Sequence, residues 1–268
     1  MLSVLMSVYY KEKPEYLHQA LKSIWDDQTV KPDEIILVED GKLTAELYEI
    51  IEQWDKKLDG RLKRIPLPEN RGLAKALNTG IKYCSGEYIA RMDSDDISAS
   101  ERFEKQTRFL KNNPDIDILG SFSYDIDNNN IIIKERRVPQ EHNQIEKLLP
   151  KLNPMTHPSV MFKKNSIIKI GCYDEKYKTS QDYHLWFKAI ANGLKLKNLS
   201  DFLLYYRMDS EYPKKKSFIY RFNEFKIKVN GYKLINYPWF RYYNALISLF
   251  LAFAPSFLFK YLKKLDPR

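Results

Sequence analysis

Residues 88–96 read YIARMDSDD, an apolar segment that runs directly into three aspartates, Asp93, Asp95 and Asp96. We interpret Tyr88–Met92 as a short strand and the acids as the loop that follows it. Three carboxylates this close repel one another unless a cation or hydrogen bonds compensate. Mg²⁺ and Mn²⁺ take oxygen ligands and can join such carboxylates to substrate phosphates. A solvated acidic turn before the next helix is the alternative.

On the N-terminal side of this segment, strand-like and helix-like patterns alternate. The expected strands are residues 3–9, 34–38, 61–67 and 88–92, with helices over 14–25, 47–58 and 72–84. This alternation is typical of an α/β fold, a Rossmann-like mostly parallel sheet flanked by helices. Such sheets bind ligands at the carboxyl ends of their strands. Polar clusters stand at three of those ends, at residues 9–10, 39–40 and 93–96.

On the C-terminal side the pattern is less regular. It predicts a helix over 101–112, a strand over 116–123, a hairpin partner over 131–138, a short strand over 157–162, a helix over 180–192 and one or two strands over 194–207. No internal repeat or low-complexity linker interrupts this series. We therefore expect one domain over residues 1–213 and a separate segment over 214–268.

Two common phosphate-binding motifs are missing from the sequence. There is no G-x-x-x-x-G-K-[ST], and no G-x-G-x-x-G follows the first expected strand, which continues as VYYK at residues 8–11. A nucleotide bound at the strand ends would therefore depend on a metal ion rather than on a glycine-rich loop.

The formal net charge of +9 is concentrated at one end of the chain. Residues 214–268 contain 12 of the 44 basic and 2 of the 35 acidic side chains, which leaves 32 basic against 33 acidic in residues 1–213. The same segment holds 15 of the 37 aromatic residues. A basic, aromatic and apolar segment indicates an anionic membrane surface as its partner, and we expect no nucleic acid partner.

Residues 242–259 form an uncharged run of 18 residues between basic side chains. At the helical rise the run would be ~27 Å long, which is the lower limit for crossing a bilayer, and Pro255 weakens a spanning helix further. We therefore expect residues 214–268 to form helices that lie in the cytoplasmic leaflet as a monotopic anchor. Packing of these helices on the preceding domain, or an oligomer interface, is the alternative.

Five motifs in order give the chain a family resemblance. They are LSVLMSVY at 2–9, VEDG at 38–41, NRGL at 70–73, ARMDSDD at 90–96 and QDY at 181–183. In this order and spacing the chain resembles the family 2 glycosyltransferases of the GT-A fold. It is most similar to the bacterial enzymes that build O-antigen or capsule repeat units on a lipid carrier. The resemblance covers residues 1 to about 210.

The resemblance implies a nucleotide-sugar donor, by family habit a UDP-hexose. In the family, the loop after the first strand and the acids after the second strand hold the base and the ribose, and an Asn-Arg-Gly segment lies beside them. The matching positions in this sequence are Val8, Tyr9, Glu39, Asp40, Asn70 and Arg71.

The resemblance also implies a metal site and a catalytic base. The family's D-x-D motif, which binds Mn²⁺ or Mg²⁺ and the diphosphate, maps onto Asp93, Ser94 and Asp95. Asp96 matches an extra acid of the O-antigen subgroup. The acid that deprotonates the acceptor hydroxyl maps onto Asp182, and displacement with one base inverts the anomeric configuration. Spacing alone favours a first-turn helix acid at Asp182, and the resemblance reverses that preference.

Three further residues are weaker candidates. Gln181 stands where the family more often has Glu, and it keeps hydrogen bonding but loses a charge. Many relatives carry a His after a Tyr-Arg pair at the end of the domain, whereas Asp209 occupies that region here and would be a substitute contact for metal or diphosphate. His157 would orient the acceptor or the diphosphate, with a structural role as the alternative.

Together these features predict an inverting, metal-dependent glycosyltransferase that moves a sugar to a hydroxyl of a polyprenyl-diphosphate-linked saccharide. The apolar run at residues 2–10 is followed, not preceded, by basic side chains, so we expect a buried strand rather than a signal peptide. Two cysteines suit a reducing compartment. The predicted location is the cytoplasmic face of the bacterial inner membrane, and oligomerisation is compatible with the sequence.

Two other functions remain open at this point. A membrane-bound scaffold that binds nucleotide-sugars without transfer would share the donor site, although Asp93, Asp95 and Asp182 argue for an active enzyme. A sugar-phosphate nucleotidyltransferase would need a glycine-rich basic loop after the first strand, and residues 8–12 do not provide one.

Overall fold

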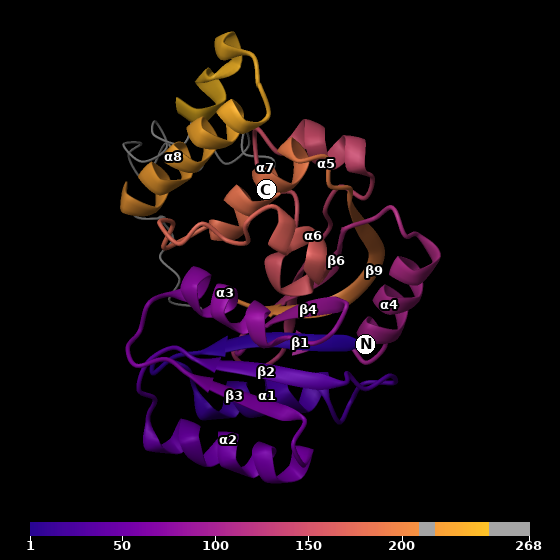
Figure 1. Cartoon of the computed structure of the whole chain (residues 1–268), viewed down its shortest axis with the longest axis vertical. Helices are drawn as coiled ribbons and strands as arrows, with labels where there is room; N and C mark the ends of the chain where they lie inside the picture. Colours follow the sequence, from indigo (N-terminus) through magenta and orange to yellow (C-terminus); the bar gives the residue numbers. More distant parts are fainter. Residues whose placement is uncertain (209–217, 247–268) are drawn as a thin grey trace.

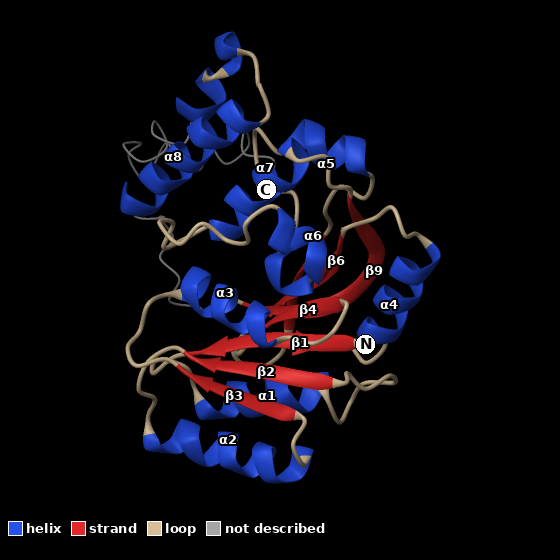
Figure 2. Cartoon of the chain, viewed as in Figure 1, coloured by secondary structure: helices blue, strands red, loops and turns tan. Residues whose placement is uncertain are grey.

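The described residues form a nine-stranded sheet with helices on both faces (Figures 1 and 2). The structure is a computed structural model and describes residues 1–208 and 218–246. The strand order is β3-β2-β1-β4-β8-β6-β9-β5, and β7 pairs with β6 outside this row.

The first four strands are parallel to one another, as the alternating pattern predicts. They are β1 (Leu2–Val8), β2 (Glu34–Glu39), β3 (Leu62–Pro66) and β4 (Tyr88–Asp93), joined through α1 (Pro14–Ile24), α2 (Ala45–Leu58) and α3 (Leu73–Tyr83). Val8 pairs with Glu39, and Ser7 pairs with Asp93. The polar loops after β1, β2 and β4 therefore leave the sheet at one edge, where the arrowheads meet in Figure 2.

The second half of the chain extends the sheet by antiparallel pairing. It contributes β5 (Ile97–Ser98), α4 (Arg102–Asn112), β6 (Ile118–Ile126), β7 (Ile132–Arg136), α5 (His142–Leu148), β8 (Met161–Lys163), α6 (Lys164–Lys169), α7 (Gln181–Ala191) and β9 (Leu196–Arg207). Here β8 is antiparallel to both β4 and β6, whereas β6 and β9 run parallel. The mostly parallel sheet predicted from the sequence is therefore found in β1 to β4, whereas β8 joins the sheet in the antiparallel direction.

The short strand expected over 157–162 begins later than the sequence suggests. Residues His157–Ser159 form a 3₁₀ turn, η1, and the strand β8 starts at Met161. Pro158 explains the difference, because it has a fixed φ and no N–H to donate to a sheet partner.

Apolar side chains on the two faces of the sheet form two cores. Adjacent residues of β1 point to opposite faces, so Leu5 joins the core under α3 and α7, and Val4 joins the core under α1 and α2. Both side chains are fully buried. Burial of a side chain of this size contributes about 1.5–3 kcal/mol.

The helix α8 (Phe218–Leu234) packs on α7 at the end of the molecule opposite α2 (Figure 1). Gly231 lies against the Phe187 ring of α7, and Tyr232 is fully buried with its hydroxyl 2.5 Å from the carbonyl oxygen of Pro150. The apolar residues on this side of α8 therefore serve the protein core.

Several predictions fall on residues that the structure does not describe. They are the domain boundary at 213/214, the contact by Asp209, and the parts of the predicted membrane segment at residues 214–216 and 247–268. In the described ranges 1–208 and 218–246, no helix combines the length and the apolar character needed to span a bilayer.

Candidate active site

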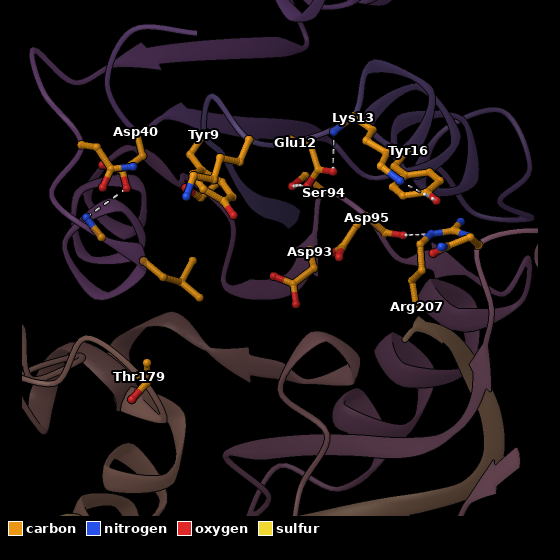
Figure 3. A pocket seen from close by; sticks show the side chains of 16 residues that line it. Tyr9, Glu12, Lys13, Tyr16, Asp40, Asp93, Ser94, Asp95, Thr179 and Arg207 are labelled. Carbon is orange, nitrogen blue, oxygen red and sulfur yellow. Dashed lines mark hydrogen bonds between the residues drawn. The ribbon is translucent and has the colours of Figure 1, made fainter. Parts of the chain in front are cut away.

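A cavity of about 610 Å³ opens at the carboxyl edge of β1, β2 and β4 (Figure 3). Its volume suits a ligand of nucleotide-sugar size. Six of the predicted residues line it, namely Tyr9, Asp40, Asn70, Asp93, Ser94 and Asp95. The rest of the lining comes from Ser7, Lys11, Glu12, Lys13, Tyr16, Gly72, Leu73, Asn128, Thr179 and Arg207.

The three aspartates after β4 form a group that fits a divalent cation. One carboxylate oxygen from each of Asp93, Asp95 and Asp96 lies within 4.8 Å of the others. Burial raises the pKa of Asp95 to about 7, and the nearby charges of Asp93 and Glu12 add to this effect. Asp96 is buried, and its Oδ2 has no hydrogen-bond partner among the described residues. Oxygen donors that repel one another in this way are the ligands that Mg²⁺ and Mn²⁺ prefer.

Glu12 adds a fourth carboxylate beside this group, and the sequence analysis did not find it. Its Oε2 accepts a hydrogen bond from the Ser94 hydroxyl at 2.5 Å, and its Oε1 accepts from the Lys13 backbone N–H at 2.8 Å. Burial raises the pKa of Glu12. Figure 3 shows Glu12 and Ser94 together above Asp93 and Asp95.

Asp40 joins the loop after β2 to the loop that precedes α3. Its Oδ1 accepts from the Arg71 backbone N–H at 2.8 Å, and its Oδ2 accepts from the Gly72 backbone N–H at 3.0 Å. Gly41 has a φ of +86°, and a Cβ there would lie 2.6 Å from the Asn70 nitrogen. This close approach fixes Asp40 and Asn70 in the wall of the cavity.

Three other residues expected to hold the nucleotide do not line the cavity. The Val8 side chain is buried in the core, and its carbonyl oxygen accepts from the Asp40 N–H at 2.8 Å. Glu39 is buried and accepts from Arg64 Nε at 2.7 Å. The Arg71 guanidinium is exposed and pairs with Glu69. In this structure their side chains support or flank the cavity wall.

Asp182 lies in the first turn of α7 and is not among the residues that line the cavity, although Thr179 shortly before it is. Its Oδ2 accepts a hydrogen bond from Asn153 Nδ2 at 2.6 Å. Burial raises the pKa of Asp182, and hydrogen bonds and the charge of Arg91 oppose the rise. The preceding Ser180 has a φ of +56°, a strained conformation for serine that sets the start of α7. Gln181 is buried beside it.

His157 is buried and engaged inside the protein. Its Nε2 lies 2.8 Å from the Tyr173 hydroxyl, and its ring contacts the Trp186 ring edge-on. Burial holds the pKa of His157 well below its usual range, so the imidazole is neutral. The structure thus places His157 beside the Asp182 helix rather than in the cavity.

Arg207, the last residue of β9, closes the other end of the cavity. Its backbone N–H donates to Asp96 Oδ1 at 2.8 Å, and its Nε donates to the Asp95 carbonyl at 2.8 Å. Its guanidinium also stacks over the Tyr16 ring, with 4.1 Å to the centroid. In the sequence, the Tyr-Arg pair before Met208 is the one feature that pointed to this residue.

Comparison with known proteins gives a consistent picture. The model of the family described as "Glycosyl transferase family 2" matches residues 3–171. A UDP-Gal:alpha-D-GlcNAc-diphosphoundecaprenol beta-1,3-galactosyltransferase of Escherichia coli is 36% identical over 98% of this chain and 94% of its own. The amylovoran biosynthesis glycosyltransferase AmsE of Erwinia amylovora is 37% identical over 87% of this chain and 85% of its own.

Solved structures share the fold. The crystal structure of S. aureus TarS 1–349 in complex with UDP-GlcNAc superposes with a TM-score of 0.66, covering 100% of this chain and 76% of that one at 20% sequence identity.

Proposed function

The chain belongs to glycosyltransferase family 2, and on that premise we propose that it transfers a hexose from a UDP-sugar to a hydroxyl of a polyprenyl-diphosphate-linked saccharide. The proposed setting is the synthesis of a surface polysaccharide such as an O-antigen or capsule. The relative from Escherichia coli is named for this donor and acceptor chemistry, and it aligns with nearly the whole chain.

One observation carries the proposal: Asp93 and Asp95 of the aspartate group line a cavity of nucleotide-sugar size at the carboxyl edge of the parallel strands. Asp93 and Asp95 are the residues that would hold a divalent cation. When bound, such an ion neutralises the negative charge that develops on the leaving diphosphate. Tyr9, Asp40 and Asn70 would contact the nucleoside.

Asp182 is the proposed base. As the acceptor oxygen bonds to the anomeric carbon and the bond to the diphosphate breaks, the hydroxyl proton passes to the Asp182 carboxylate. Asn153 Nδ2 donates to Asp182 Oδ2 at 2.6 Å and orients this carboxylate. A single displacement of this kind inverts the configuration of the transferred sugar.

The proposal is tested by a donor screen with purified full-length protein. UDP-Gal, UDP-Glc, UDP-GlcNAc and GDP-Man are each incubated with a synthetic lipid-diphosphate GlcNAc acceptor and Mn²⁺, and products are identified by mass spectrometry. We expect one UDP-sugar to add one hexose, with loss of activity in EDTA and an inverted anomer by NMR.

Other outcomes separate the alternatives. Calorimetric binding of a UDP-sugar without turnover on any acceptor would indicate a scaffold. Release of pyrophosphate from UTP and a sugar phosphate would indicate a nucleotidyltransferase. Retention of the anomeric configuration would contradict the single-base mechanism.

We also propose that residues 214–268 attach the enzyme to the cytoplasmic face of an anionic membrane. The turn after α8 supports this, because Trp239 is 82% exposed, Phe240 60% and Tyr243 58%. Residues 225–246 include four basic and no acidic side chains. Among the described residues of the segment, this turn holds the most exposed large apolar side chains.

A further inference from the structure

Two buried arginines, Arg91 and Arg102, lie on opposite faces of β4 near the aspartate group, and their hydrogen bonding differs. All three Arg102 nitrogens have partners: Nε donates to Gln106, Nη1 contacts the Met92 sulfur, and Nη2 donates to the Arg91 carbonyl at 2.7 Å. Arg91 is 1% exposed and uses only Nη2, which donates to Asp93. Its Nε and Nη1 have no partner among the described residues.

This difference indicates that Arg102 is structural and that Arg91 is placed for another purpose. A buried donor without a partner destabilises the fold, and the cost is larger for a charged group. Arg91 carries two such donors, whereas each nitrogen of Arg102 has a partner. The open donors of Arg91 are therefore available to an acceptor bound beside Asp93.

Arg91 lies on the face of the sheet that α3 and α7 cover. Side chains alternate along β4, so Arg91 and Asp93 point to the same face, toward α3 and α7. The Arg91 backbone N–H donates to the Val160 carbonyl at 2.9 Å, next to η1, and His157 of η1 bonds Tyr173. The Arg91 charge also acts on Asp182, whose pKa it lowers against the effect of burial.

We propose that Arg91 is a positioning residue for sugar transfer, which holds the Asp93 carboxylate in place at the edge of the cavity. The proposal rests on the proposed function. The guanidinium suits this task, since its planar fork holds Asp93 through Nη2 and keeps Nε and Nη1 for a further acceptor, which a lysine ammonium does less well.

The test compares Arg91→Met, Arg91→Lys and the matched control Arg102→Lys in the full-length protein. Mn²⁺ affinity in the presence of UDP is measured by calorimetry, and kcat and donor KM are measured with the lipid-linked acceptor. We expect Arg91→Met to lower kcat about 100-fold with donor KM changed less than threefold, as for other buried electrostatic donors. Mn²⁺ affinity should fall about tenfold, because the group that orients Asp93 is lost.

The two other variants separate positioning from stability. Arg91→Lys keeps the charge and should recover about a tenth of the wild-type kcat, whereas Arg102→Lys should lower Tm and leave kcat and Mn²⁺ affinity of the folded protein unchanged. Full activity of either Arg91 variant, or equal losses in the Arg91 and Arg102 variants, would overturn the proposal. If the wild type transfers no sugar, the proposed function fails, and the calorimetry still decides whether Arg91 orients Asp93.

Discussion

Asp182 is the residue on which the proposed chemistry depends most directly. Replacement by asparagine keeps the shape and the contact with Asn153 but removes the proton acceptor. We expect Asp182→Asn to reduce kcat by about 10²–10⁴-fold, the usual contribution of a general base, with UDP-sugar affinity within a factor of three. Turnover is measured by product mass spectrometry and affinity by calorimetry.

Asp174→Asn is the matched control, because Asp174 is a half-buried acid in the loop before α7 and pairs with Lys176 at 2.7 Å. It should keep wild-type turnover. An active Asp182→Asn enzyme would exclude Asp182 as the base.

Asp95 makes a pH prediction, because burial raises its pKa to about 7. The unfolded chain releases this proton near its ordinary pKa of about 3.9, so the folded protein binds more protons between these values. The contribution of the Asp95 carboxyl to the stability of the metal-free protein is therefore highest below pH 4, and it falls as the pH rises toward 7. Mn²⁺ requires the ionised form, so it should raise Tm more at pH 8 than at pH 6.

Differential scanning fluorimetry with and without Mn²⁺ at the two pH values measures this difference. Asp95→Asn should remove the pH dependence of the Mn²⁺ effect. Equal Tm increments at both pH values in the wild type would show that Asp95 is not a ligand.

At the residue scale, the sequence predicted the acids better than the basic residues. Tyr9, Asp40, Asn70, Asp93 and Asp95 all line one cavity, because each follows a parallel strand and such strands end at one edge. Arg91 had no such signal: an arginine inside a strand gives no indication of its burial, which follows from packing by η1 and α4. Glu12 and Arg207 reach the site through contacts between distant parts of the chain, which spacing does not reveal.

At the scale of elements, α8 follows the alternative that the sequence left open, because it packs on α7 of the preceding domain. Its basic and apolar composition favoured a helix that lies on a membrane, and membrane binding by residues 214–268 stays a prediction. Composition cannot distinguish these cases, since a bilayer and a protein core accept the same side chains. The first four strands were predicted well because each is a short apolar run bounded by turn residues.

Gly231→Ala tests the contact between α8 and α7. A Cβ at this position would lie 2.3 Å from the Phe187 ring, so the ring or one of the two helices must shift. We expect a loss of about 1–3 kcal/mol in the free energy of unfolding, measured by urea titration. In an unpacked helix the same change would instead stabilise by up to about 1 kcal/mol.

Lys233→Ala, on an exposed position of the same helix, is the control and should change stability by less than about 0.5 kcal/mol. A stabilised Gly231→Ala protein would show that α8 does not pack on α7 in solution.

At the scale of the whole molecule, the exposed aromatic turn predicts how the enzyme meets a membrane. Trp239→Ala combined with Phe240→Ala should weaken binding to phosphatidylglycerol-containing vesicles at least tenfold, because each large apolar side chain contributes about 1.5–3 kcal/mol when it leaves water. Vesicle sedimentation of the full-length protein measures the effect.

Ile131→Ala combined with Ile133→Ala is the control for exposed apolar surface elsewhere, since these side chains are 63% and 61% exposed next to β7. This double variant should bind vesicles like the wild type. Equal losses in both double variants would exclude a specific role for the turn after α8.

Because Arg207 lies far along the chain, its bonds to the acidic loop form late during synthesis of the protein. Arg207 is 111 residues beyond Asp96, whose carboxylate accepts its N–H. At about 5–20 residues per second, a ribosome needs roughly 6–22 s to cover that distance. The strands β1, β2 and β4 are therefore synthesised well before this bond can form. Until β9 leaves the ribosome, the acidic loop lacks the N–H that binds Asp96, and the candidate site is incomplete.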